Sequence, residues 1–177
     1  MSSREDLRKL IIDRAVVHGR VTLSSGRTAD HYVDLRRITL HHAAAPLVGD
    51  VMLDVVAGWD FEAVGGLTLG ADPIAAAMLH AAGARGRALD AFVVRKAEKQ
   101  HGLERRIEGP DVAGRRVLAV EDTSTTGASV LTAVDALREA GADVAAVAVI
   151  VDRGAADAVR AAGLEYRAAY VLDDLDL

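Results

Sequence analysis

A run of acids, hydroxyls and a glycine follows the apolar residues 117–120 and is suited to binding a phosphorylated sugar. The run consists of Glu121, Asp122, Thr123, Ser124, Thr125, Thr126, Gly127, Ala128 and Ser129. Free N–H groups at the start of a helix, joined by Thr and Ser hydroxyls, can surround a phosphate. Two carboxylates would repel that phosphate, so we expect Glu121 and Asp122 to accept hydrogen bonds from sugar hydroxyls or to help hold a cation. A helix cap with two solvated acids is the alternative interpretation.

A second cluster places three cations and a histidine within seven residues, directly after the apolar residues 91–94. The members are Arg95, Lys96, Lys99 and His101. Alone, such a cluster would be explained by a solvated charged turn. Next to a phosphate site, cations can also stabilise a departing diphosphate electrostatically.

Arg153 is a third candidate, because it follows the apolar residues 145–151 in the sequence Val-Asp-Arg. A structural ion pair with Asp152 is one interpretation of this pair. A guanidinium group is also suited to planar recognition of a carboxylate or a carbonyl edge. Both interpretations remain open at this point.

The elements that must position these residues alternate between strands and helices. Apolar runs predict strands over 63–66, 91–94, 117–120 and 145–151, and helical spacing predicts helices over 7–19, 43–57, 128–140 and 155–162 and another from Pro73. Alternation of this kind predicts a parallel α/β sheet, with ligands at the carboxyl ends of the strands. The three candidate segments all follow predicted strands.

Length and composition set further limits. The chain has 177 residues, which predicts one domain spanning residues 1–177. It has no cysteine, which excludes disulfides and thiolate chemistry, and its net charge of -5 disfavours broad nucleic-acid binding. No apolar run reaches the roughly 18 residues of a membrane span, and the polar N-terminus is unlike a secretory signal. We therefore expect a cytoplasmic protein without membrane partners. The histidines at 18, 41, 42 and 80 lack companions at metal-ligand spacing and are expected to be structural or solvated.

Residues 117–129 resemble the phosphoribosyl-diphosphate signature of the type I phosphoribosyltransferases, which is four apolar residues, two acids and a Thr/Gly-rich loop. The resemblance implies that Glu121 and Asp122 face the ribose 2′ and 3′ hydroxyls. It also implies that residues 123–129 surround the 5-phosphate. The implied fold is an α/β domain whose central parallel sheet is flanked by helices, with a small N-terminal hood over roughly residues 1–40.

The spacing Arg-Lys-x-x-Lys-x-His-Gly at residues 95–102 is similar to the mobile catalytic loop of orotate phosphoribosyltransferases. In that family the loop reaches into the neighbouring subunit, which implies a homodimer with a shared 95–102 loop. The resemblance also assigns orotate binding to Arg153, Thr125 and Tyr32.

Two segments depart from the pattern of that family. Residues 23–34 are similar to its segment beside the base, but Ser24 replaces the usual lysine, and Tyr32 and Val33 replace two aromatic residues. Contact with the base is therefore expected to be partly aliphatic. Residues 65–73 take the place of the diphosphate-binding loop and lack its lysine, so Thr68, Gly70 and backbone N–H groups would have to replace that cation.

The implied activity is transfer of 5-phosphoribosyl from its 1-diphosphate to orotate in pyrimidine biosynthesis. Mg²⁺ is the expected cofactor, bound mainly through substrate oxygens and water. One alternative is a transferase for another base, and a second is an RNA-binding pyrimidine regulator on the same fold. The acidic net charge and the cationic 95–102 segment both argue against the regulator.

Overall fold

The apolar runs of the sequence form the strands of one sheet in the computed structural model, which describes residues 2–22, 28–96 and 106–177. The strands of this sheet are β3 (Ala63–Leu67), β4 (Asp90–Val94), β5 (Ile107–Glu108), β6 (Arg116–Ser124), β7 (Asp143–Asp152) and β8 (Glu165–Val171). Their order is β5-β4-β3-β6-β7-β8. All neighbours pair in parallel except β4 and β5, which are antiparallel. The predicted strands and their parallel arrangement are confirmed, while β5 and β8 were not predicted.

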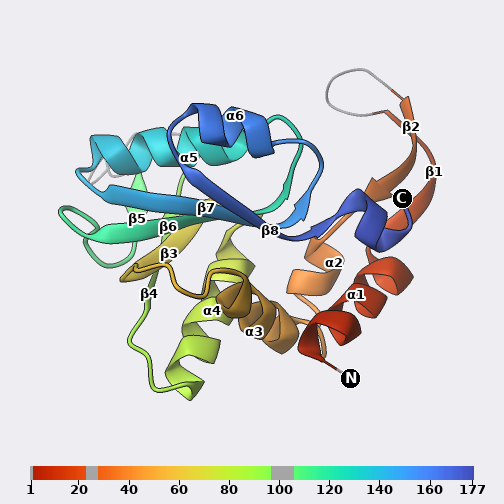
Figure 1. Cartoon of the computed structure of the whole chain (residues 1–177), viewed down its shortest axis with the longest axis horizontal. Helices are drawn as coiled ribbons and strands as arrows, with labels where there is room; N and C mark the ends of the chain where they lie inside the picture. The colour runs from red at the N-terminus through yellow and green to blue at the C-terminus, as the bar shows by residue number, and fades with distance from the viewer. Residues whose placement is uncertain (1, 23–27, 97–105) are drawn as a thin grey trace.

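Helices cover both faces of this sheet. They are α1 (Ser3–Arg14), α2 (Arg36–Thr39), α3 (Ala45–Val55), α4 (Asp72–Ala84), α5 (Ala128–Glu139), α6 (Ala156–Ala161) and the 3₁₀ helix η1 (Leu172–Leu175). Helices α5 and α6 lie on one face, and α3 and α4 lie on the other (Figure 1). None of the helices in the described ranges is long and apolar enough to cross a membrane.

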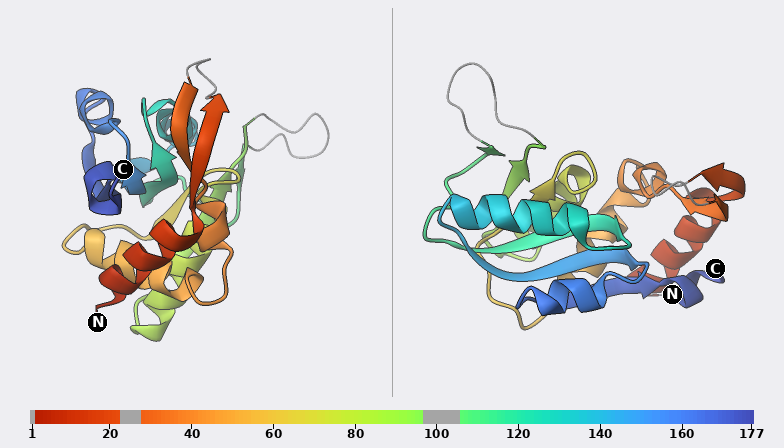
Figure 2. Two further views of the ribbon diagram at one scale, coloured as in Figure 1. Left: turned by 90° about the vertical axis from the view of Figure 1, so that its right-hand side faces the viewer. Right: turned by 90° about the horizontal axis from the view of Figure 1, so that it is seen from above.

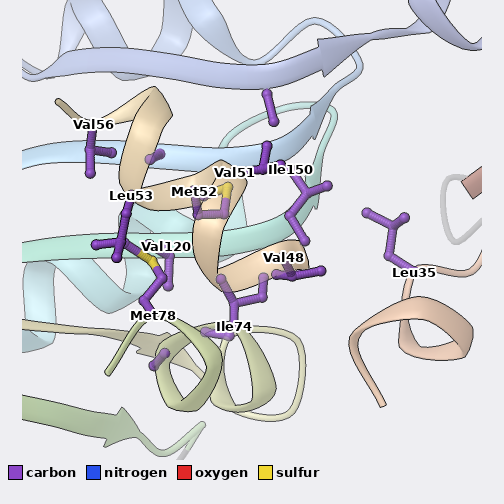
Figure 3. Packing of buried hydrophobic residues seen from close by; sticks show 14 of the residues in the cluster. Leu35, Val48, Val51, Met52, Leu53, Val56, Ile74, Met78, Val120 and Ile150 are labelled. Atoms are coloured by element: carbon purple, nitrogen blue, oxygen red, sulfur yellow. The ribbon is translucent and has the colours of Figure 1, made fainter. Parts of the chain in front are cut away.

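The central strands β3, β6 and β7 contain continuous apolar runs because both faces of the sheet are buried there. In β6, Leu118 and Val120 belong to the core on the α3–α4 side, whereas Val117 and Ala119 belong to the core under α5. Figure 3 shows side chains of α3 and α4 packed toward Val120 of β6 and the following strand. This explains why continuous apolar runs, rather than alternating ones, marked the strands.

The N-terminal helix is shorter than predicted, because the chain leaves the helix after Arg14. Residues 16–22 form β1 (Val16–Thr22), which pairs antiparallel with β2 (Thr28–Val33). The prediction of a helix up to about Gly19 was therefore wrong. Val16 and Val17 are β-branched and favour a strand, and Gly19 has a φ of 139° that a helix cannot contain.

Contacts with the C-terminus hold α1 in place. The Tyr170 hydroxyl donates a hydrogen bond to the Arg4 carbonyl at 2.6 Å, and Arg8 forms an ion pair with Asp176 at 3.1 Å. The carboxyl ends of β6, β7 and β8 point toward the side of the molecule that carries α1, α2 and the β1–β2 pair (Figures 1 and 2). The N-terminal elements are therefore placed next to the strand ends where ligands are expected.

Candidate active site

A cavity of about 240 Å³ lies at the carboxyl ends of β3 and β6. Its lining combines strand ends with residues from β2 and the start of α2: Tyr32, Arg36, Leu67, Thr68, Leu69, Gly70, Lys96, Glu121, Asp122, Thr123 and Ser129. Two larger hollows, of about 530 and 650 Å³, lie at the amino ends of the strands and along α3 and α4. The smaller cavity is the candidate site, because its lining includes Tyr32, Lys96 and members of the 121–129 segment.

The acid pair lies within β6 rather than after it. Glu121 pairs in register with Val149, and the strand continues to Ser124. The Glu121 side chain is buried, and its Oε1 accepts a hydrogen bond from the Asp122 N–H at 3.2 Å. A Cβ on Gly70 would lie 2.3 Å from that same oxygen, so the 68–70 loop approaches the acids closely at this glycine.

The Glu121 carboxyl group is unusually difficult to ionise. Burial, together with the negative charges of Asp122 and Asp72, raises its pKa to about 8. Glu121 is therefore mostly protonated near pH 7 in the ligand-free protein. A protonated Glu121 can donate to one sugar hydroxyl, while oxygens of the adjacent Asp122 can accept from another.

The raised pKa of Glu121 leads to a prediction about how the stability of the protein depends on pH. An acid whose pKa is raised by folding binds more protons in the folded than in the unfolded state, so stability falls as pH rises from about 4.5 to about 8. Glu121→Gln removes this pH-dependent contribution to stability. We therefore expect the unfolding free energy of the variant to fall by a few kcal/mol less than that of wild type over the same pH range. Urea unfolding of the ligand-free protein at pH 5, 6, 7 and 8 measures the difference. Exposed Glu139→Gln is the control, and curves for Glu121→Gln that stay parallel to wild type would contradict the assignment.

The turn between β6 and α5 has the form of an anion-binding helix start. Gly127 precedes α5 with a left-handed φ of 78°, and the Ala128 N–H donates to Thr126 Oγ1 at 3.3 Å. Thr123 and Ser129 line the cavity, while Thr125 and Thr126 are exposed and Ser124 is buried. The first N–H groups of a helix have no carbonyl partner within it, so this turn offers donors to a ligand.

The loop after β3 forms the part of the cavity wall beside the acids. The Thr68 hydroxyl donates to Asp72 Oδ2 at 2.6 Å, and the Thr68 N–H donates to the Val94 carbonyl at 2.9 Å. The peptide bond between Thr68 and Leu69 is cis. These contacts hold the loop against the end of β4.

The two members of the predicted cationic cluster that the structure describes, Lys96 and Arg95, have different surroundings. Lys96 is exposed and lines the cavity. Arg95 is not among the lining residues, and its Nη1 lies 3.4 Å from Glu108 Oε1 on β5. Lys99 and His101 lie outside the described residues, so their roles stay predictions.

Arg153 lies beside the end of β6, because its N–H donates to the Ser124 carbonyl at 2.8 Å. Asp152 does not serve as its ion-pair partner. Asp152 Oδ1 instead accepts hydrogen bonds from the N–H groups of Gly154 and Ala155 and from the Tyr166 hydroxyl. The Arg153 Nε is buried and has no hydrogen-bond partner among the described residues. Arg153 is not a lining residue of the cavity.

Of the two residues predicted to lie beside the base, Tyr32 and Val33, only Tyr32 lines the cavity. Tyr32 is partly exposed and lines the cavity. Val33 is 2% exposed and belongs to the core, so the expected aliphatic contact from Val33 was wrong. Ser24 lies outside the described residues.

Sequence reasoning missed Arg36, which lines the cavity from the start of α2. Its side chain is held by Asp34, whose Oδ1 accepts from the Arg36 Nε at 2.9 Å. The available signal was the Asp-x-Arg spacing two residues after Tyr32, in the segment already suspected of facing the base.

The site contains acids but no preformed metal cluster. Within residues 2–22, 28–96 and 106–177, no three His, Cys, Asp or Glu side chains are arranged to hold a metal ion. Glu121, Asp122 and Asp72 are near enough to influence one another electrostatically. This arrangement suits an ion that keeps most of its ligands from substrate and water.

Comparison with known proteins gives consistent matches. Residues 49–163 match the model of the phosphoribosyl transferase domain. An orotate phosphoribosyltransferase from Streptomyces avermitilis is 69% identical over 98% of this chain and 97% of that protein. A crystal structure of Mycobacterium tuberculosis H37Rv orotate phosphoribosyltransferase with Fe(III) dicitrate matches with a TM-score of 0.90 at 57% identity, covering 99% of this chain and 100% of that chain. The structure of that enzyme with 5-phospho-alpha-D-ribosyl 1-diphosphate matches with a TM-score of 0.86 at 53% identity and the same coverage.

Proposed function

The chain belongs to the orotate phosphoribosyltransferases of the phosphoribosyltransferase family, and we propose on this premise that it transfers 5-phosphoribosyl from 5-phospho-α-D-ribose 1-diphosphate to orotate. The products are orotidine 5′-monophosphate and diphosphate, in the de novo pathway to UMP. The observation that carries the proposal is that the acid pair, the 5-phosphate turn and the cation Lys96 meet in one cavity.

The reaction exchanges one bond at the ribose C1 for another. The bond from C1 to the diphosphate oxygen breaks, and the electron pair leaves with diphosphate. N1 of orotate forms the new bond to C1 and loses its proton, which diphosphate or solvent accepts. No enzyme nucleophile is required. The protein contributes by aligning two anionic substrates and by stabilising the charge that accumulates on the leaving group.

Each part of the sugar substrate is assigned to its own set of residues. Glu121 and Asp122 are assigned to the ribose hydroxyls, and residues 123–129 to the 5-phosphate. The cations at 95, 96 and 99 and His101 are assigned to the diphosphate. The acids and the phosphates are thereby kept on different sides of the ribose, as charge repulsion requires.

Orotate is assigned to Arg153, Thr125 and Tyr32. A Cβ on Gly154 would lie 3.7 Å from the Thr125 carbonyl, which supports a close approach of the turns that carry Thr125 and Arg153. The first roughly 40 residues act as a hood over the base, within a single domain spanning residues 1–177. The position of Tyr32 in the cavity lining supports this role for the hood.

Mg²⁺ would complete the site in this proposal, held mainly by substrate oxygens and water. When bound to the diphosphate, it neutralises part of the leaving-group charge.

We further propose a cytoplasmic homodimer in which the 95–102 loop is shared between subunits, so that Lys96 lines the cavity of its own chain and Lys99 and His101 are assigned to the neighbouring site. The support is the resemblance of this segment to the family loop. Neither nucleic acid nor membrane is a partner in this account, which the net charge of -5 favours.

A panel of bases tests the substrate. The protein is incubated with the sugar diphosphate, Mg²⁺ and, in separate reactions, orotate, uracil, adenine, guanine or hypoxanthine. A loss of base absorbance is expected only in the reaction that contains orotate. Turnover of uracil or a purine, but not of orotate, would show that the acceptor is that other base. Absence of turnover with every base, together with RNA binding, would favour the RNA-binding regulator.

Arg153→Ala is expected to raise the Michaelis constant for orotate roughly ten- to a hundredfold, since a charge-assisted contact contributes about 1.5–3 kcal/mol. The constant for the sugar diphosphate should change little. Steady-state kinetics with either substrate varied measures both constants, and Arg160→Ala, an exposed arginine of α6, is the control. A change confined to the sugar diphosphate constant would assign Arg153 to another part of the site.

A further inference from the structure

The basic and acidic side chains among the described lining residues are two cations and two adjacent acids. Arg36 and Lys96 are its cationic lining residues, and Glu121 and Asp122 are its acidic ones. A diphosphate brings several negative charges into this small space, so it has to lie toward the cations and away from the acids. Among the described lining residues, Lys96 offers a single point charge, and Arg36 is the other cation.

Arg36 is oriented by its own neighbour in the chain. Asp34 Oδ1 accepts hydrogen bonds from the Arg36 Nε at 2.9 Å and from the Arg36 backbone N–H at 3.3 Å. Asp34 is itself anchored, because its N–H donates to the Ala15 carbonyl at 2.9 Å. The bond to Asp34 uses only Nε, so the four N–H donors on the two Nη atoms are not used by this carboxylate.

Arg36 is also within electrostatic reach of the acid pair. Its hydrogen bond with Asp34 raises its pKa most, and the charge of Asp122 adds a smaller amount. The side chain is half-exposed, so a ligand entering the cavity can reach it. A guanidinium group can bind two phosphate oxygens at once, which an ammonium group cannot.

We infer that Arg36, held in orientation by Asp34, binds the diphosphate of the sugar substrate from the hood side of the cavity. The inference rests on the proposed function, because it takes the sugar diphosphate as the ligand. It gives the N-terminal hood a role in holding the leaving group as well as covering the base.

Arg37 provides a matched control for this assignment. It follows Arg36 directly, and its Nε lies 3.9 Å from the other oxygen of Asp34. It is 57% exposed and does not line the cavity. Arg36→Gln and Arg37→Gln therefore remove the same charge from the same carboxylate, but only the first removes it from the cavity.

The first measurement is calorimetric binding of inorganic diphosphate with Mg²⁺, which requires no turnover. Arg36→Gln should weaken this binding roughly ten- to a hundredfold, Arg36→Lys should restore part of it, and Arg37→Gln should stay within about twofold of wild type. In steady-state kinetics, Arg36→Gln should raise the constant for the sugar diphosphate and leave that for orotate nearly unchanged. Thermal unfolding confirms that the variants are folded.

Equal effects of Arg36→Gln and Arg37→Gln would reduce Arg36 to a structural partner of Asp34 and overturn the inference. A loss specific to orotate, with diphosphate binding unchanged, would overturn it as well. Failure of the proposed function would look different, because wild type would then not turn over orotate while the binding comparison of the two arginine variants still gives a result.

Discussion

Asp122→Asn is expected to lower the affinity for the sugar diphosphate by at least about a hundredfold and to leave orotate binding almost unchanged. The carboxylate is assigned to ribose hydroxyls, and each charge-assisted hydrogen bond that is lost costs about 1.5–3 kcal/mol. The amide keeps the shape of the side chain, and its oxygen can still accept from the Thr123 N–H, which lies 2.6 Å from Asp122 Oδ1. Titration calorimetry with each substrate measures the two affinities.

The control for this substitution is Asp60→Asn, an exposed acid at the amino ends of the strands. It removes the same charge from the protein as a whole and should change neither affinity. Equal weakening of both substrates by Asp122→Asn would show that the acid pair maintains the site in general and does not select the ribose.

Lys99→Ala is expected to reduce turnover severely without unfolding the protein, because Lys99 is assigned to the departing diphosphate. If the 95–102 segment serves the neighbouring subunit, Lys99→Ala and Asp122→Asn damage different halves of a shared site. Mixing the two inactive variants under conditions of subunit exchange should then restore activity. With random exchange of equal amounts, half of the dimers are mixed and each has one intact site, so recovery should approach about a quarter of wild type.

A second mixture controls for this recovery. Lys99→Ala mixed with His101→Ala places both lesions in the same segment, so every site in a mixed dimer contains a damaged copy and no recovery is expected. Exchange is confirmed independently by chromatography of differently tagged subunits. A Lys99→Ala and Asp122→Asn mixture that exchanges but stays inactive would mean that the segment serves its own subunit.

The sheet was predictable because its strands are buried on both faces and its chemistry follows the strand ends. The runs at 63–66, 91–94, 117–120 and 145–151 all lie within strands of the structure. The strand β8 was missed because the sequence Glu-Tyr-Arg-Ala-Ala-Tyr-Val mixes charged and aromatic residues at a sheet edge. Only two residues form β5, too few for any periodic signal.

The cavity lining was predictable where one segment carries several polar groups, because Glu121, Asp122, Thr123 and Ser129 of the 121–129 segment line the cavity. It was not predictable where function depends on contacts between distant segments. Arg36 enters the cavity only because β1 and β2 pair and α1 is tied to the C-terminus, and no local pattern encodes that arrangement. The raised pKa of Glu121 likewise depends mainly on burial by distant segments, with a smaller contribution from the charge of Asp72 in α4.

The pairing of diphosphate release with orotate consumption tests the central claim most directly. Wild-type protein, the sugar diphosphate, Mg²⁺ and orotate are combined and followed by phosphorus NMR, with orotate absorbance recorded in parallel. The account predicts that one diphosphate and one orotidine 5′-monophosphate appear for each orotate consumed, and that omitting orotate stops diphosphate release. Release of diphosphate with ribose 5-phosphate while orotate stays intact would contradict it, because the cavity would then activate the sugar for water and not for the pyrimidine.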